Sequence, residues 1–192
     1  MALLELRLNE FLEEVAGEEH MPGGGSLAAV VTAASAGLLA KVARASKGDW
    51  GDAGAVAAQA ESLRERAAPL AQLSAEGYAA ALRSIEEVEG QAPERRDFAV
   101  GRAYARAAEP PLKIAEAAAD VAELAVTVAR NGDPNLRADA VVAAALASAA
   151  ARAAAELVAV NLTASANDER VTQAQKLAGL AARAADEAFA GG

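Results

Sequence analysis

The stretch from Ala138 to Val160 reads ADAVVAAALASAAARAAAELVAV and decides the fold class. Alanine is the strongest intrinsic helix former and a poor strand former, so this stretch predicts one long helix. Only three charged residues interrupt it, namely Asp139, Arg152 and Glu156. These charges, together with the small size of alanine, favour a buried helix of a globular protein over a membrane span.

The alanine bias extends over the whole chain. Alanine accounts for 58 of the 192 residues, whereas aromatic residues make up only 3% and hydrophobic residues as a group 54%. This composition excludes an all-β protein, and so large an apolar share beside 23% charged residues excludes general disorder. We therefore expect an all-α fold in which a single multi-helical domain spans residues 1–192.

Apolar periodicity, glycines and prolines divide the chain into about seven helices, and Pro69 is expected to kink or break the longest of them. The expected helices cover residues 2–16, 27–46, 53–88, 94–108, 110–130, 136–164 and 167–189. The second has hardly any polar side chain before Lys41, so it should be central in the bundle or lie in a subunit interface. Because buried alanines contribute little apolar area, we expect a homodimer; a monomer with thin helix contacts is the alternative.

Charge and reactive residue types exclude several classes of function. The net charge is −9 and no basic run exceeds Arg95-Arg96, so a nucleic-acid partner is not expected. The chain has no cysteine and one histidine, His20, which excludes disulfides, thiolate chemistry and a multi-histidine metal site. Residues 1–7 lack the basic start of a signal peptide. We expect a cytoplasmic protein with neither a membrane partner nor a metal.

The most informative motif is Pro22-Gly-Gly-Gly-Ser26-Leu-Ala-Ala, which precedes an apolar helix. Ser26 is a good N-cap residue, so we expect the helix to begin at Leu27. The uncovered N–H groups of residues 23–25, together with the helix dipole, could bind an anion. The alternative is a tight turn that only leads into the helix.

A second candidate segment is the run NGDPNLRAD at residues 131–139. Asn135 and Asp139 are four residues apart and share one face of a helix. The carboxylate of Asp139 either caps the following helix or lies in a dry pocket, where it would act as a base or hold a cation. Further candidates have simpler explanations in surface ion pairs or core packing; they are Arg96, Arg102, Arg106, Arg137, Trp50, Tyr78, Phe98 and Tyr104. His20 lies beside the glycine motif, and a lone histidine in a loop is more often incidental than catalytic.

Several segments resemble the cyclodeaminase / methenyltetrahydrofolate cyclohydrolase family. This family forms the second half of bifunctional formiminotransferase-cyclodeaminase and also occurs alone in bacteria. Phe11-Leu-Glu-Glu-Val with the glycine motif resembles its opening, and Ala107-Ala-Glu-Pro-Pro-Leu-Lys-Ile-Ala resembles its Pro-Leu helix start. Asp133-Pro-Asn-Leu-Arg-Ala-Asp-Ala-Val-Val-Ala-Ala and the pair Asn161-Leu also resemble family segments. The likeness covers nearly the whole chain.

The resemblance implies an all-helical homodimer that handles one-carbon derivatives of tetrahydrofolate. One activity of the family closes formiminotetrahydrofolate to the methenyl form with loss of ammonia. The other interconverts methenyl- and 10-formyltetrahydrofolate by adding water. The 192 residues leave no room for a formiminotransferase domain, which favours the cyclohydrolase activity. The folate substrate is the expected ligand, and no further cofactor is expected.

Under this resemblance, the family positions suggest which residues take part. Hydrolysis of the cationic methenyl bridge needs an activated water and a carboxylate near the cation. We therefore expect Asp139 and Asn161 to be the catalytic residues. The residues expected to bind the substrate are Gly23, Gly24, Gly25, Ser26, Lys47 and Asn135.

The chain also departs from the family pattern. Lys47 is the single lysine where many members carry a Gly-Lys-Lys stretch, and Ser74 aligns with an expected aspartate, with Glu76 nearby. Ala138 stands where a serine precedes the aspartate, and Glu156 replaces a frequent asparagine. These changes keep open a second interpretation, a catalytically lapsed folate-binding or helical interaction protein.

Overall fold

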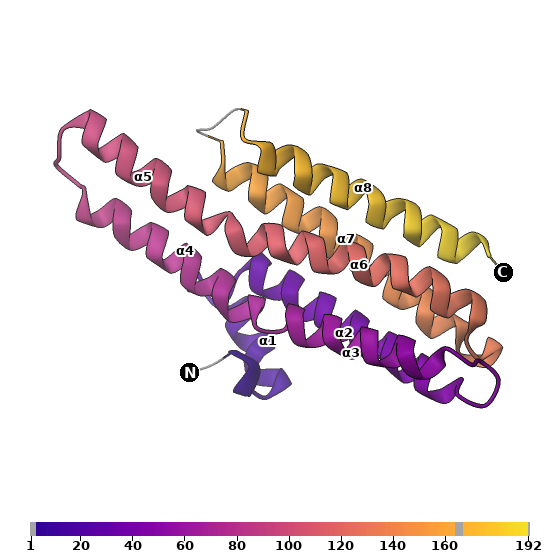
Figure 1. Cartoon of the computed structure of the whole chain (residues 1–192). Coiled ribbons are helices and arrows are strands. Elements are labelled where there is room, and N and C mark those ends of the chain that lie inside the picture. Colours follow the sequence, from indigo (N-terminus) through magenta and orange to yellow (C-terminus); the bar gives the residue numbers. More distant parts are fainter. Residues whose placement is uncertain (1–2, 164–166, 192) are drawn as a thin grey trace.

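A computed structural model describes residues 3–163 and 167–191, which form an all-α bundle (Figure 1). Two short 3-10 helices, η1 (Leu3–Glu5) and η2 (Pro134–Leu136), precede α1 and α7. The α-helices are α1 (Leu8–Ala16), α2 (Gly24–Ala45), α3 (Ala53–Ala67), α4 (Leu70–Glu87), α5 (Pro93–Ala107), α6 (Glu109–Asn131), α7 (Arg137–Asn161) and α8 (Glu169–Ala190). The expected all-α class is confirmed.

Helix α6 is the centre of the bundle. It packs against α2, α3, α4, α7 and α8, and its buried residues lie on nearly every side of it. The sequence predicted that the apolar helix after the glycine motif, α2, would be central or interfacial. In the structure α6 is the central helix. Helix α2 is not surrounded on all sides, because one side of it is exposed, including Leu27 and Ala34.

Helices α2 and α7 lie side by side and run in opposite directions. At one end Lys41 of α2 forms an ion pair with Asp139 of α7, with 2.9 Å between Nζ and Oδ2. At the other end Gly25 of α2 lies close to Leu157 of α7. The two ends of this helix pair are therefore the two ends at which the predicted site residues lie.

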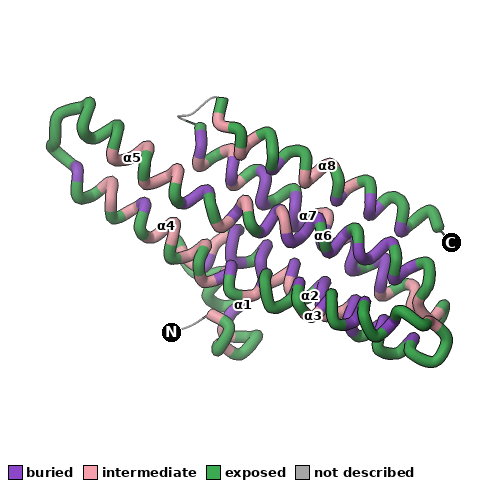
Figure 2. Tube along the Cα trace, viewed as in Figure 1, coloured by how far each residue is buried: buried purple, intermediate pink, exposed green. Residues whose placement is uncertain are grey.

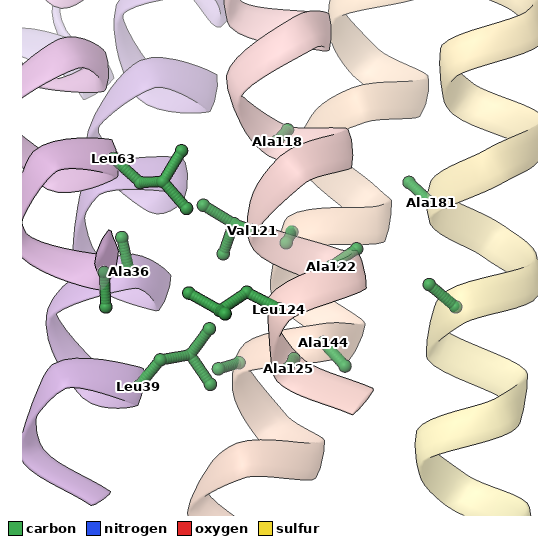
Figure 3. Close-up of a cluster of buried hydrophobic side chains, with 14 of the residues drawn as sticks. Ala36, Leu39, Leu63, Ala118, Val121, Ala122, Leu124, Ala125, Ala144 and Ala181 are labelled. Atoms are coloured by element: carbon green, nitrogen blue, oxygen red, sulfur yellow. The ribbon is translucent and has the colours of Figure 1, made fainter. Parts of the chain in front are cut away.

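The core consists of a few large side chains set among alanines (Figure 3). Leu39, Leu63, Val121 and Leu124 come from α2, α3 and α6 and are at most 7% exposed. Alanines of α6, α7 and α8 fill the remaining contacts, including Ala125, and their small size lets the helix axes approach closely. Each alanine buries little apolar area, so the large side chains carry a disproportionate share of the hydrophobic stabilisation.

Two helix boundaries answer specific expectations. Pro69 breaks the long helix expected over residues 53–88 into α3 and α4, which is the stronger of the two effects predicted for it. Ser26 is not an N-cap, because α2 begins at Gly24 and its N-cap residue is Gly23. The hydroxyl of Ser26 instead donates to the carbonyl oxygen of Ala71 in α4, at 2.7 Å. Ser26 therefore links α2 to α4 instead of capping the N-terminus of α2.

Helices α4 and α5 form an arm that extends beyond the other helices (Figure 1). Residues 91–98 at its far end are all exposed, whereas Ala107 and Ala108 at its base are buried (Figure 2). The base of this arm forms part of the cavity described below.

Two segments are long and apolar enough to cross a membrane by length and composition alone, namely Gly24–Ala45 and Pro134–Asn161. In the fold, 61% of the most apolar stretch of the first and 50% of that of the second are buried among other helices. Core helices of globular proteins meet the same criteria of length and hydropathy. The burial of both segments among other helices is what is expected of such core helices.

Candidate functional site

A cavity of about 310 Å³ lies at the N-terminus of α2. Its walls come from the loop before α2 and the first turn of α2, from α4, from the junction of α5 and α6, and from the end of α7. The lining residues are His20, Met21, Gly23, Gly24, Gly25, Ser26, Ser74, Ala75, Tyr78, Ala107, Pro111, Leu157, Val160 and Asn161. Of the residues predicted from the sequence to form the site, the cavity unites residues 23–26 of the glycine motif with Asn161.

The glycine motif presents backbone N–H groups to this cavity. The first intrahelical hydrogen bond runs from the Leu27 N–H to the Gly23 carbonyl at 3.1 Å, and no side chain caps the helix at Gly23. The N–H groups of residues 24–26 precede that bond and have no carbonyl partner within the helix. Together with the helix dipole, they favour a carbonyl oxygen or an anion at this point.

Gly24 and Gly25 have different structural reasons to be glycine. A Cβ on Gly25 would collide with the Ser74 hydroxyl oxygen and lie 3.1 Å from the Ser74 Cβ, so Gly25 permits α2 to approach α4. A Cβ on Gly24 would meet no atom within 4 Å. Neither residue has a positive φ, so the tight-turn alternative does not account for them. Packing within the chain therefore does not require a glycine at position 24, which lies in the cavity wall.

Besides Ser26, whose hydroxyl bonds to Ala71, the polar side chains of the cavity come from three different segments. Asn161 donates its Nδ2–H to the carbonyl oxygen of Ala107 at 3.2 Å, which leaves its amide oxygen as an acceptor. Ser74 and Tyr78 lie one turn apart on α4, and His20 lies in the loop before α2. The set offers hydroxyl, amide and imidazole groups on an otherwise apolar wall. Among the described residues that line the cavity, none is an aspartate or a glutamate.

A smaller hollow of about 270 Å³ adjoins the cavity and shares Met21 and Ala75 with it. It carries two carboxylates, those of Glu14 and Glu76. Glu76 accepts a hydrogen bond from Gln72 Nε2 at 2.9 Å, so its position is partly held by its own helix. If the reaction requires a carboxylate near the cavity, Glu76 is therefore an alternative to Asp139 that lies on the same chain as the cavity.

The other predicted residues gather at the far end of α2 and α7. Asp139 has 36% of its side chain exposed and is paired with Lys41, so it does not lie in a dry pocket of its own chain. Asn135 is exposed and bonds to Asp133 through both its backbone N–H and its side chain, each at 2.9 Å. Lys47 is exposed on the turn after α2.

This second group is far from the cavity within one chain. Asp139 and Asn161 lie near opposite ends of α7, 22 residues apart along the helix, which corresponds to about 33 Å at 1.5 Å per residue. The expectation that Asp139 and Asn161 act together is therefore not met inside a single chain. Their separation divides the predicted site into a cavity group and a far-end group.

A charged pair holds the base of the arm beside the cavity. Asp168, the N-cap of α8, accepts hydrogen bonds from the Arg170 guanidinium at 2.7 and 2.9 Å and from the Arg170 N–H at 3.0 Å. These bonds lower the pKa of Asp168 to about 2. Arg170 also donates to the carbonyl oxygen of Ala105 at 2.8 Å, so the pair ties α8 to α5 near the cavity residue Ala107.

Larger surface hollows carry none of the residues singled out in the sequence as a site. One of about 470 Å³ lies between α3 and α6, where Arg66 and Asp120 form an ion pair. Another, of about 830 Å³, runs along residues 167–177 at the start of α8. Neither is built from the glycine motif or from α7.

Comparison with known proteins agrees with this architecture. The sequence profile of the family described as formiminotransferase-cyclodeaminase matches residues 7–178. The chain belongs to this family. The crystal structure of formiminotetrahydrofolate cyclodeaminase from Thermotoga maritima superposes with a TM-score of 0.83 at 21% sequence identity, covering 97% of this chain and 95% of that one. No match was found among curated protein sequences.

Family membership confirms the resemblance drawn from the sequence motifs, and the cavity shows where those motifs meet. The glycine motif, the Pro-Leu helix start at Pro111 and the Asn161-Leu pair are separate in the sequence of this family member but come together around one cavity. Ser74, which aligns with an expected aspartate, is also in the cavity wall. That departure from the family pattern therefore falls at the site itself.

Sequence reasoning gave too little weight to two cavity residues of this family member. His20 and Tyr78 were candidates with simpler explanations, yet both line the cavity. The signal for Tyr78 was its spacing of four residues from Ser74, which places both side chains on one face of a helix. The signal for His20 was its place beside the glycine motif, two residues before Pro22, although a lone histidine in a loop is more often incidental than functional.

Proposed function

We propose that the protein closes formiminotetrahydrofolate to methenyltetrahydrofolate with loss of ammonia, and that the cavity at the N-terminus of α2 binds the ring end of the substrate. The observation that carries the proposal is the convergence of three family motifs on this one cavity in a member of the formiminotransferase-cyclodeaminase family. The name of the structurally similar Thermotoga protein supports the same reaction.

The shape and lining of the cavity suit a flat, polar-edged ring. A volume of about 310 Å³ is at the lower end of the range for small-molecule sites, so it would hold the pterin and its one-carbon group but not the whole folate. Tyr78 offers an aromatic face, and Leu157 and Pro111 provide apolar walls. The N–H groups at the start of α2 and the amide oxygen of Asn161 would bond to the polar ring edge.

The reaction requires one proton to move between two nitrogens. N10 of the substrate attacks the formimino carbon, which forms a tetrahedral adduct with an amino group. The adduct then loses the N10 proton, and the amino group gains one and leaves as ammonia, so the methenyl product carries the positive charge that the protonated formimino group had. His20 lines the cavity, its imidazole has one nitrogen that can accept a proton and one that can donate a proton, and we assign this proton transfer to it.

The hydrolytic activity of the family would use the same site. Water adds to the methenyl carbon and loses one proton, which gives a neutral adduct with a hydroxyl group. The bond between this carbon and N5 then breaks, the hydroxyl proton leaves as the formyl group forms, and N5 gains a proton, so the net products are 10-formyltetrahydrofolate and one proton. Both reactions pass through a tetrahedral adduct on the same carbon, so the same binding groups serve both. The two activities differ in the attacking and leaving groups rather than in the cavity.

The test follows the methenyl chromophore in the ultraviolet. Purified protein with formiminotetrahydrofolate should produce the chromophore faster than the spontaneous reaction, and His20→Ala should lower the rate roughly a hundredfold, the usual scale of general acid–base catalysis. Asn161→Ala should lower the rate as well, because it removes a group at the cavity. Gln91→Ala is the matched control, since Gln91 is exposed at the far end of the arm and its side chain donates to the carbonyl oxygen of Glu87 away from the cavity.

A second candidate function is binding of folate without turnover. It is favoured by the lack of a carboxylate among the described cavity residues, since a cationic one-carbon bridge calls for a nearby negative charge. Calorimetry with methenyltetrahydrofolate, combined with the chromophore assay, separates the two functions. Binding with no acceleration of either reaction would select the second function, and absence of both would exclude a folate role.

A further inference from the structure

The last turn of α5 contains a backbone carbonyl group that its own helix cannot pair. In a continuing helix, the carbonyl oxygen of Ala107 would accept from the N–H group four residues later. Position 111 is a proline, which has no N–H group. Ala107 is 4% exposed and lines the cavity, so bulk water has little access to it. A buried carbonyl group in the cavity wall therefore needs a donor from elsewhere in the chain.

Two side chains on either side of the connection between α7 and α8 supply donors to this last turn. Asn161, the last residue of α7, donates from Nδ2 to the carbonyl oxygen of Ala107 at 3.2 Å. Arg170, in the first turn of α8, donates from Nη1 to the carbonyl oxygen of Ala105 at 2.8 Å. The last turn of α5 is thus held by one residue that lines the cavity and by one that does not.

The guanidinium group of Arg170 is itself held in place by Asp168. Its Nε and Nη2 atoms donate to the two carboxylate oxygens of Asp168 at 2.9 and 2.7 Å, and this bidentate pairing leaves Nη1 for Ala105. Among the ion pairs of the described residues, this one has the least exposed side chains, 29% for Arg170 and 20% for Asp168. Capping of α8 needs only the bond from the Arg170 N–H group to Asp168, so the side-chain bonds exceed what the cap requires.

The shape of the arm concentrates the restraint on α5 at its base (Figure 1). Helix α5 packs chiefly against α4, and residues 91–98 at the far end of the arm are exposed. At the base, Ala105 and Ala108 pack in a small apolar cluster with Val158 of α7 and Ala174 of α8. These small side chains offer little contact area, so the hydrogen bonds of Asn161 and Arg170 are important in fixing the last turn of α5.

We propose that Arg170 is a positioning residue for the cavity: it holds the last turn of α5, fixes the carbonyl group of Ala107 and thereby keeps the amide oxygen of Asn161 in place for the substrate. The nature of that substrate, a folate ring whose polar edge bonds to this oxygen, rests on the proposed function. Within the described chain, the bond to Ala107 is the one hydrogen bond of the Asn161 side chain, so a shift of Ala107 is transmitted to it. Arg170 does not line the cavity and acts through Asn161.

The first experiment observes Asn161 without any substrate. In a nitrogen–proton NMR spectrum of labelled protein, the signals of its side-chain amide are identified by their loss in Asn161→Ala. Arg170→Met should shift these signals, whereas Arg66→Met should leave them unchanged. Arg66 is the matched control because it also joins two helices through an ion pair, with Asp120, but lies between α3 and α6. Circular dichroism verifies that all variants remain helical. Identical Asn161 signals in Arg170→Met and the wild type would overturn the proposal.

The second experiment separates positioning from a purely structural role by kinetics. Arg170→Met should raise KM for formiminotetrahydrofolate about tenfold, the scale of one hydrogen bond, with a smaller change in kcat. Asn161→Ala should show the same division between KM and kcat. A purely structural role of Arg170 would lower the folded fraction, which lowers the apparent kcat and leaves KM unchanged. Arg170→Lys, which keeps a cation but not the planar fork, should recover part of the affinity.

The third experiment tests whether Arg170 acts through Asn161. If it does, adding Arg170→Met to Asn161→Ala should change KM by less than about twofold, because the group that Arg170 positions is already absent. Two effects on KM that multiply would show that Arg170 acts independently of Asn161 and would overturn the proposal, as would an unchanged KM in Arg170→Met. If the wild type neither converts nor binds the folate, the proposed function fails, while the NMR signals of Asn161 still decide whether Arg170 positions it.

Discussion

At the scale of the residue, two adjacent glycines separate packing from ligand binding. Gly25 is required where α2 touches Ser74, whereas Gly24 borders open space in the cavity wall. A methyl group added at each position should therefore have a different consequence. A substitution at Gly24 therefore tests ligand binding without a loss of stability, whereas a substitution at Gly25 tests packing.

We expect Gly25→Ala to lower the free energy of unfolding by about 1 to 3 kcal/mol, because the new Cβ must displace Ser74. Gly24→Ala should leave this free energy unchanged or raise it by up to about 1 kcal/mol, since alanine is the better helix former. Yet Gly24→Ala should weaken folate binding, because Gly24 lines the cavity and an added methyl group reduces the room beside its N–H group. Urea unfolding and calorimetry measure the two quantities, and undiminished affinity in Gly24→Ala would remove the motif from the binding site.

The ion pair of Asp168 and Arg170 makes stability depend on pH. The pKa of Asp168 falls from an ordinary value of 3.8 to about 2 in the folded chain, so its stabilising effect is fully present above about pH 4 and is lost as the pH falls through 2. Because both side chains are partly exposed, we expect Asp168→Asn to lower the free energy of unfolding by about 1 kcal/mol at pH 7.

The Asn side chain keeps an oxygen that can accept from the Arg170 N–H, so the variant removes the charge rather than the helix cap. The difference between wild type and variant should shrink as the pH is lowered from 4 to 2. Thermal unfolding across this range measures it. A difference that is independent of pH would show that the cap, and not the charge, carries the effect.

At the scale of the element, the alanine-rich helices place unusual weight on a few large side chains. Ile114 on α6 is fully buried among alanines, whereas Phe98 on α5 is 68% exposed. The central helix and the arm therefore differ in what a truncated side chain costs. Isoleucine and phenylalanine have similar helix propensities, so the difference in the free energy of unfolding between the two alanine variants should come from packing.

Ile114→Ala should lower the free energy of unfolding by about 2 to 5 kcal/mol, because it leaves a cavity in the centre of the bundle. Phe98→Ala should change this free energy by less than about 0.5 kcal/mol. Urea denaturation of both variants measures the contrast. A large loss in Phe98→Ala would mean that the arm is covered by another surface in solution, which the isolated chain does not show.

At the scale of the whole molecule, the homodimer expected from the sequence would connect stability to assembly. Exposed apolar side chains on α2 and α7, among them Leu27, Val142 and Leu146, are the candidates for its interface. If two copies share this surface, unfolding is coupled to dissociation and the midpoint of thermal unfolding rises with protein concentration. We expect this rise for the wild type and for Phe98→Arg, and its loss for Leu146→Arg. Differential scanning calorimetry over a hundredfold range of concentration measures the effect. A midpoint independent of concentration in the wild type would argue for a stable monomer.

Much of the fold followed from local physical chemistry. The alanine content predicted an all-α chain, and prolines and glycines placed most helix ends within a few residues of those observed. Pro69 was expected to kink or break a helix and breaks it. The start of α2 was misplaced by three residues, because the Ser26 hydroxyl bonds to Ala71 across to α4 instead of capping its own helix. A contact 45 residues distant in sequence leaves no local signal.

The sequence by itself determined the helical class, most of the helix boundaries and the family, since these depend on propensity and on motifs read in order. Only the tertiary structure decided that Ser74, Tyr78 and His20 join the glycine motif and Asn161 around one cavity. It also decided that Asp139 lies at the other end of α7. The reason is that motif order is a property of the chain, whereas distance between motifs is set by the direction in which each helix packs. Two residues that share a helix can be about 33 Å apart, and residues on four different segments can line the same 310 Å³.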